Sequence, residues 1–217
     1  MSLTKSKLPN ILKTNPLAPE FEIITKAAQT IESGGIVIIP TFGLYGMAAD
    51  AFNPQSLKRI FDLKNRPETN PLLIFIKNSG ILDTLVNDIS PDARKLMAAF
   101  WPGKATLIFH AQSHLSHILT AGTGKIGIRV PGHPVTDALV QSLSCPITGT
   151  SANISGEQGC NDISSLSDSI LTNADLILDA GPLKDGPGST VIDTTCHPVR
   201  ILREGAISSE AVFKALT

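Results

Sequence analysis

The sequence predicts an α/β fold, a twisted mixed open sheet flanked by helices, and two recurring patterns support it. Short, continuously apolar runs such as residues 36–39 and 72–76 are typical of strands covered on both faces. Between such runs, Asn53-Pro54 and Ser90-Pro91 each combine a helix N-cap with proline at the first helical position. Strands that alternate with helices along the chain indicate helices packed on a largely buried sheet. Ligands usually bind such sheets just beyond strand ends, so we expect a concave pocket there.

The expected elements follow in order along the chain. A flexible lead-in is expected over residues 1–16, ahead of a single domain over residues 17–217. The first helix is expected over residues 19–32, because Gly34 and Gly35 then supply a left-handed stop. Further helices are expected over residues 54–64, 91–100, 135–143 and 209–216. Strands are expected over residues 36–39, 72–76, 105–109, 126–130, 146–150, 176–178, 190–192 and 199–202.

Composition and charge limit the class of protein. The 217 residues are 42% hydrophobic and 17% charged, which is ordinary for an α/β protein with a packed core. A formal net charge of −1 argues against a broad nucleic-acid-coating surface but leaves room for a local basic pocket. No apolar run approaches the roughly 20 residues that span a bilayer, and no signal-peptide pattern is present. Three widely spaced cysteines suggest a reducing compartment, so we expect a cytoplasmic protein without membrane contact.

The first candidate cluster is Lys64-Asn65-Arg66-Pro67, between a predicted helix and a predicted strand. Two cations one residue apart suit a polyphosphate, because arginine forks onto it and lysine acts as a point charge. The alternative is that these cations complement the carboxyl end of a helix. The cluster by itself favours the alternative.

The second cluster covers residues 148–153 and follows a strand. Its small hydroxyl and amide side chains, including Ser151 and Asn153, suit an anion, although a plain polar turn explains them equally well. A serine-hydrolase elbow is a weaker interpretation, because Asn153 stands where that motif needs glycine.

The third cluster contains Lys125 and Arg129. Arg129 lies within an apolar strand, and a buried arginine requires an anionic partner, either a ligand or a structural carboxylate. Residues 122–125 superficially suggest a P-loop. Leu119 replaces the required earlier glycine and Ile126 the magnesium-binding hydroxyl, so we reject that motif.

The last cluster lies near the C-terminus, where Ser189 and Arg203 each stand beside glycine at a strand edge. A zinc site is not expected at His110, His114 and His117, because no adjoining acid or cysteine completes a ligand set.

Taken in order, these clusters resemble one family, the threonylcarbamoyl-adenylate synthases of the YrdC-like (YrdC-YciO) type. The resemblance covers residues 21–217 and rests mainly on the paired K-x-R and S-x-N signatures. Other matching segments are residues 34–51, 70–72, 101–106, 128–134, 189–193 and 201–205.

The resemblance implies a nucleotidyltransferase that condenses L-threonine, bicarbonate and ATP into threonylcarbamoyl-adenylate and pyrophosphate, with Mg²⁺ accompanying the ATP. A tRNA-modifying transferase complex would use the product. Lys64, Arg66, Ser151 and Asn153 would form the catalytic set. The implied ATP contacts are Arg66, Asn70, Lys125, Ser151, Asn153 and Arg203, and the implied amino-acid contacts are Thr41, Arg129 and Ser189.

Two positions depart from the family pattern on the amino-acid side. Gly43 stands where the family has a substrate-binding threonine, and Phe75 stands where many synthases have histidine. Losing such polar contacts alters selectivity, so the sequence leaves open a paralogue that adenylates a different carbamate. A double-stranded-RNA-binding module of the same fold is the other alternative, which a wide positive surface would support.

Overall fold

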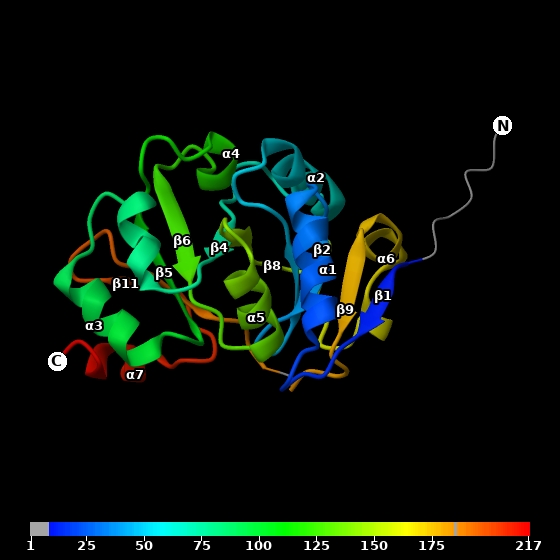
Figure 1. Ribbon diagram of the computed structural model, residues 1–217. Helices are drawn as coiled ribbons and strands as arrows, with labels where there is room; N and C mark the ends of the chain where they lie inside the picture. Colours follow the sequence, from blue (N-terminus) through cyan, green and yellow to red (C-terminus); the bar gives the residue numbers. More distant parts are fainter. Residues whose placement is uncertain (1–8, 185) are drawn as a thin grey trace.

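Two mixed sheets form the centre of the part of the chain that this computed structural model describes, residues 9–184 and 186–217. The first has the order β1-β9-β2-β3-β8, with bounds Ile11–Lys13, Leu176–Asp179, Val37–Pro40, Tyr45–Ala48 and Thr150–Ser151. The second has the order β11-β10-β5-β6-β4-β7, with bounds Arg200–Arg203, Thr190–Asp193, Ala105–His110, Lys125–Arg129, Leu73–Phe75 and Ile147–Thr148. Figure 1 shows the first sheet on the right and the second on the left. Both combine parallel and antiparallel pairs, as the sequence predicts.

Helices cover these sheets. They are α1 (Phe21–Glu32), α2 (Pro54–Lys64), α3 (Pro91–Phe100), α4 (His117–Thr120), α5 (Pro134–Ser142), α6 (Asp168–Asn173) and α7 (Ser209–Lys214). Helices α1 and α5 pack against each other and against β2, and their apolar faces close one core cluster. The predicted caps are confirmed, because the side chains of Asn53 and Ser90 accept hydrogen bonds from the first turns of α2 and α3. Among the described helices, none is both long and apolar enough to cross a membrane.

The two sheets meet at Gly149, the residue between β7 and β8. The sequence predicts one strand over residues 146–150, whereas the chain leaves the second sheet at Thr148 and enters the first at Thr150. A Cβ atom on Gly149 would lie 2.4 Å from the Phe75 ring, so only glycine allows this close passage. The passage of the chain from one sheet to the other therefore depends on the close packing of Gly149 against Phe75, which strand propensities cannot predict.

Some elements differ from the prediction. The expected lead-in over residues 1–16 contains β1, which pairs in parallel with β9, so a flexible lead-in is wrong for residues 11–13. Residues 1–8 lie outside the described residues. The sequence also misses β3, which contains glycine, and the short helices α4 and α6. Pairing with β2 and β8 forms β3 in spite of its weak intrinsic strand preference.

Candidate active site

A cavity of about 340 Å³ lies where the two sheets meet, and we call it the central cavity. The first sheet and its turns contribute Thr41, Tyr45 and Ser151, and the second sheet contributes Phe75, Thr106, Arg129 and Arg203. Its described lining contains three arginines, Arg66, Arg129 and Arg203, and no aspartate or glutamate. A chain with almost no net charge thus concentrates positive charge in one hollow, which suits a ligand carrying several negative charges.

One face of the second sheet forms the floor. Thr106 and Ile108 of β5, Gly127 and Arg129 of β6, and Val191 of β10 line the cavity at every second position. Alternate residues of a strand share a face, so this period of two identifies the floor. Ile108, Gly127 and Val191 belong to this floor although they are not among the predicted site residues, and the period of two in the sequence is the signal that could have found them.

Arg129 ends β6 and is 5% exposed. Its Nε donates to the carbonyl of Gly103, and its guanidinium lies 5.6 Å from the centroid of the Phe75 ring. Burial, with the nearby Arg203 charge, lowers the pKa of Arg129 to about 10. Within the described residues it forms no ion pair, so its positive charge is available to an anion in the cavity.

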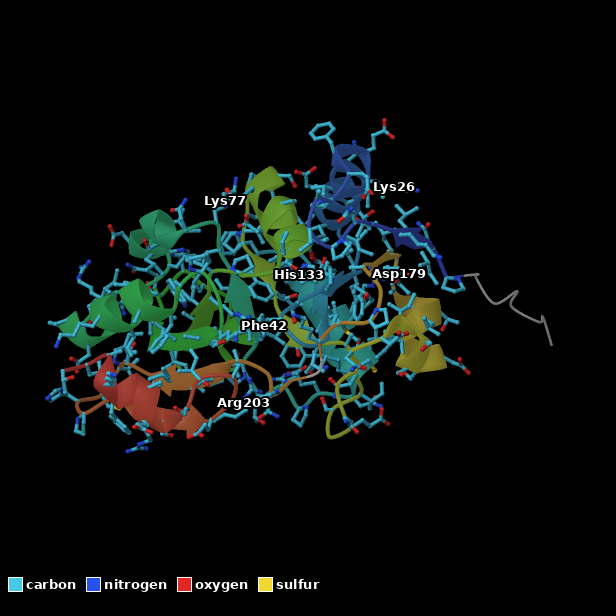
Figure 2. The ribbon with its side chains drawn as sticks, turned by 90° about the horizontal axis from the view of Figure 1, so that it is seen from below. Lys26, Phe42, Lys77, His133, Asp179 and Arg203 are labelled. Atoms are coloured by element: carbon cyan, nitrogen blue, oxygen red, sulfur yellow. The ribbon has the colours of Figure 1, made fainter. Side chains whose placement is uncertain are left out.

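Arg203 approaches from β11 and is fixed through Ser189. Its Nε and Nη2 donate to the Ser189 carbonyl over 3.2 and 2.7 Å, and Nη2 also reaches the Ser189 hydroxyl. That hydroxyl shares a 2.8 Å hydrogen bond with the Thr106 hydroxyl. Figure 2 labels Arg203 together with Phe42, another lining residue. Because these contacts are all to neutral groups, they orient the guanidinium, and no carboxylate among the described residues pairs with its charge.

Arg66 enters the cavity just after α2. Asn65 adopts a left-handed conformation at φ 48°, which ends the helix and turns the chain. The Arg66 side chain then donates to the main-chain carbonyls of Asn70 and Pro71 over 3.1 and 2.8 Å, and burial lowers its pKa. Asn70, predicted as an ATP contact, is exposed and holds Arg66 through its carbonyl, and its side chain is not part of the cavity lining.

The K-x-R and S-x-N segments come together in space. Arg66 and Ser151 both line the cavity. Lys64 and Asn153 lie behind them, where the Lys64 ammonium donates to the main-chain carbonyls of Ser151 and Asn153. Lys64 is 1% exposed and Asn153 8%, and neither belongs to the cavity lining. The predicted catalytic set is therefore divided into two lining residues and two supporting residues.

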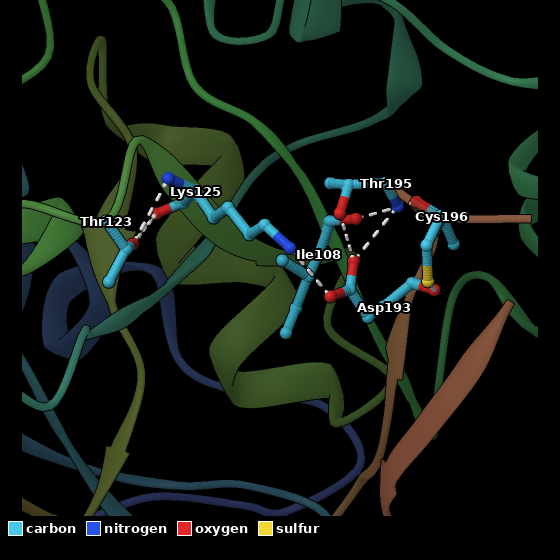
Figure 3. A network of polar contacts seen from close by, with 7 residues as sticks. Ile108, Thr123, Lys125, Asp193, Thr195 and Cys196 are labelled. Atoms are coloured by element: carbon cyan, nitrogen blue, oxygen red, sulfur yellow. Dashed lines mark hydrogen bonds and ion pairs between the residues drawn. The ribbon is translucent and has the colours of Figure 1, made fainter.

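Lys125 does not take the position expected for an ATP contact. It starts β6, four residues before Arg129, and is absent from the cavity lining. Its ammonium forms an ion pair with Asp193 over 2.9 Å, and the main-chain N–H of Thr195 donates to the same carboxylate (Figure 3). A structural ion pair thus engages this lysine, which its sequence position could not reveal.

Of the residues that the family resemblance assigns to the amino-acid substrate, including the two departures Gly43 and Phe75, the cavity lining contains some and lacks others. Thr41 lines the cavity, and its hydroxyl donates to the Leu44 carbonyl across a tight turn. Phe75 lines the cavity beside Arg129. Gly43 does not line it: at φ 89°, a Cβ atom there would face the main-chain oxygen of Gly186 at 3.4 Å. The expectation that Gly43 removes a substrate contact therefore differs from the structure, whereas Phe75 does give the cavity an apolar wall.

Comparison with known proteins identifies the class. Residues 29–205 match the Sua5/YciO/YrdC family model, which carries the description "telomere recombination". The chain therefore belongs to the Sua5/YciO/YrdC family, as the resemblance predicts.

Particular relatives are similar along most of this chain. The threonylcarbamoyl-AMP synthase of Pyrococcus abyssi is 34% identical over 88% of this chain and 56% of its own length. The Bacillus subtilis enzyme of the same name is 33% identical over 92% of this chain and 58% of its own length. The crystal structure of P. abyssi Sua5 complexed with L-threonine superposes with a TM-score of 0.90 at 33% identity, covering 94% of this chain and 60% of the other. This chain thus spans little more than half the length of these relatives.

Proposed function

We propose that this chain is a nucleotidyltransferase that forms threonylcarbamoyl-adenylate from L-threonine, bicarbonate and ATP. The observation that carries the proposal is the convergence of three guanidinium groups, from three separate chain segments, in one cavity whose described lining lacks carboxylates. The names of the P. abyssi and B. subtilis relatives support the same activity. The product would pass to a tRNA-modifying transferase complex in the cytoplasm.

The proposed reaction has two steps. The threonine amine adds to carbon dioxide formed from bicarbonate, and loss of one proton to solvent gives a carbamate. A carbamate oxygen then attacks the α-phosphorus of ATP, the bond to the β-phosphate oxygen breaks, and pyrophosphate leaves. Neither step needs a covalent bond to the protein, so the protein acts by holding two anions in line and compensating their charge.

The cavity residues divide between the two substrates in this proposal. Arg129, buried and without an ion-pair partner in the described chain, holds the threonine carboxylate. Arg66 and Arg203, with the hydroxyl of Ser151, hold the phosphates of ATP in the same cavity. Arginine suits both roles because its planar fork matches carboxylate and phosphate oxygens.

Magnesium enters the proposal only as part of the substrate. The described residues contain no group of three or more His, Cys, Asp or Glu side chains placed to hold a metal, and the described cavity lining offers no carboxylate. Mg²⁺ is commonly bound through substrate phosphates with few protein ligands. MgATP as the nucleotide substrate is therefore consistent with this site, and no catalytic step is assigned to a protein-bound ion.

A second candidate function is the same chemistry with a different amino acid. Phe75 favours it, because this ring lines the cavity beside Arg129 and offers no hydrogen bond to a substrate hydroxyl. RNA binding stays an untested alternative.

Pyrophosphate release from ATP and bicarbonate, screened across amino acids, tests the proposal. Threonine should give the fastest release for the first candidate, and another amino acid for the second. Release that is independent of any amino acid would contradict both.

A further inference from the structure

Lys64 is the last residue of α2 and is 1% exposed, although lysine is rarely buried without an ionic partner. Its ammonium donates to the carbonyls of Ser151 and Asn153, the latter over 2.6 Å. It forms no ion pair within the described residues. Two carbonyl dipoles therefore take the place of a carboxylate around this charge.

The main chain strengthens the same connection. The Lys64 carbonyl accepts a hydrogen bond from the Ser155 N–H over 2.8 Å, so both the backbone and the side chain of one residue hold residues 151–155. The turn is also closed internally, because the Asn153 amide donates to the carbonyls of Ile154 and Glu157 over 2.7 and 2.8 Å. The end of α2 thus sets where this turn lies.

The contacts of Lys64 matter for the cavity because residues on both sides of them line it. Arg66, two residues beyond Lys64, lines the cavity, and so does Ser151, whose carbonyl Lys64 holds. Lys64 itself is absent from the lining. Helix α2 is in turn fixed to the core by Leu57 and Ile60, both fully buried. The lysine therefore ties two cavity residues from distant parts of the sequence to one rigid helix end.

We propose that Lys64 is a positioning residue, which sets the distance between Ser151 and Arg66 for nucleotide binding and does not contact the nucleotide. The inference rests on the proposed function in one respect, that ATP binds at Arg66 and Ser151. This positioning role requires a lysine, because a shorter or neutral side chain cannot give both buried carbonyls a charge-assisted hydrogen bond.

A double-mutant cycle on ATP binding tests the inference, using calorimetry on the wild type, Lys64→Met, Ser151→Ala and the double variant. If Lys64 acts through the position of Ser151, Lys64→Met should weaken ATP binding roughly tenfold in the Ser151 background but less than about threefold in the Ser151→Ala background. Lys58→Met, an exposed change on the same helix, is the matched control and should leave the affinity unchanged.

A direct phosphate contact predicts the opposite result. Lys64→Met would then cost the same factor in both backgrounds, and the positioning role would be overturned. If Lys64→Met does not fold, Lys64→Gln, which is neutral and shorter but polar, replaces it in the cycle, and the same pattern is expected: a larger loss of ATP affinity in the Ser151 background than in the Ser151→Ala background. Failure of the wild type to bind ATP would contradict the proposed function itself, so the two failures are distinguishable.

Discussion

The ammonium of Lys64 donates to the main-chain carbonyl of Asn153 over 2.6 Å, although 89 positions separate the two residues. This contact joins the end of α2 to the turn after β8, and so brings the K-x-R and S-x-N segments to one side of the central cavity. The four members of this shared signature nevertheless do not share one position relative to the cavity. Arg66 and Ser151 face the cavity, whereas Lys64 and Asn153 support them from behind.

Replacing Arg129 should remove the binding site of the amino-acid carboxylate. We expect Arg129→Met to lower kcat/KM for the amino acid at least roughly 30-fold, about 2 kcal/mol, mainly by raising its KM. ATP binding, measured separately by calorimetry, should change much less. Arg59→Met, at an arginine paired with Asp175 outside the cavity lining, serves as the control. An unchanged amino-acid KM in Arg129→Met would remove this residue from the site.

Arg203 and Lys125 should behave differently, although the family resemblance assigns both to ATP. Arg203→Ala should weaken ATP binding by roughly 1.5–3 kcal/mol, the range for hydrogen bonds to charged groups. Lys125→Ala should leave it within about twofold, because this lysine pairs with Asp193. Its ion pair is partly exposed, so its loss should cost less than about 1 kcal/mol of stability. Calorimetry with ATP and a denaturant titration check both; equal losses of ATP affinity would contradict the placement of Lys125.

The aromatic wall at Phe75 should limit selectivity between threonine and its analogues. An apolar surface discriminates by roughly 1–3 kcal/mol per methylene, far less than a hydrogen bond to a substrate hydroxyl. We expect Phe75→His to raise the ratio of kcat/KM for threonine over valine, and Phe75→Leu to leave that ratio low. If the unmodified protein already prefers threonine over valine by several orders of magnitude, the prediction for Phe75 is wrong.

Gly43→Thr should instead destabilise the turn, because the φ of 89° at this position strains any residue with a Cβ atom.

The stability of the protein should depend on pH through Lys64. Burial, followed by the Arg66 charge, lowers the pKa of Lys64 from 10.5 to about 8 in the folded protein. Between pH 8 and 10.5 the unfolded chain therefore binds more protons than the folded one, and stability rises with pH. The wild type should gain up to about 3 kcal/mol relative to Lys64→Met between pH 7 and 10.

Denaturant titrations of both proteins at several pH values measure this change. Most other groups are shared by the two proteins, so the difference between them reports mainly on Lys64 and on Arg66, whose charge is coupled to it. A stability difference that is constant with pH would show that the pKa of Lys64 is not lowered.

Much of the fold was predictable because its signals are local. The proline-started helices after Asn53 and Ser90 and the apolar strands lie where cap chemistry and hydrophobic runs place them. By contrast, β3 forms by pairing with β2 and β8, and the break between β7 and β8 at Gly149 depends on contact with Phe75. Strand β8 and Phe75 lie outside the short stretch of sequence around each feature, so local patterns do not predict them.

The candidate site shows the same limit. Residue type indicates that Arg66, Arg129 and Arg203 suit anions, and all three line the cavity. It cannot indicate that Asp193 engages Lys125, or that two carbonyls engage Lys64, because those partners come from distant segments. Cation positions could thus be predicted from sequence more readily than cation partners.

Mass spectrometry with ¹³C-labelled bicarbonate tests most directly the central claim, that the cavity joins an amino-acid carbamate to the α-phosphate of ATP. Wild-type protein incubated with threonine, labelled bicarbonate and MgATP should yield a threonylcarbamoyl-adenylate that carries one ¹³C, together with pyrophosphate in equal amount. Arg129→Met should yield far less of it under the same conditions. Conversion of ATP to ADP and phosphate, or an adenylate without the label, would contradict the claim.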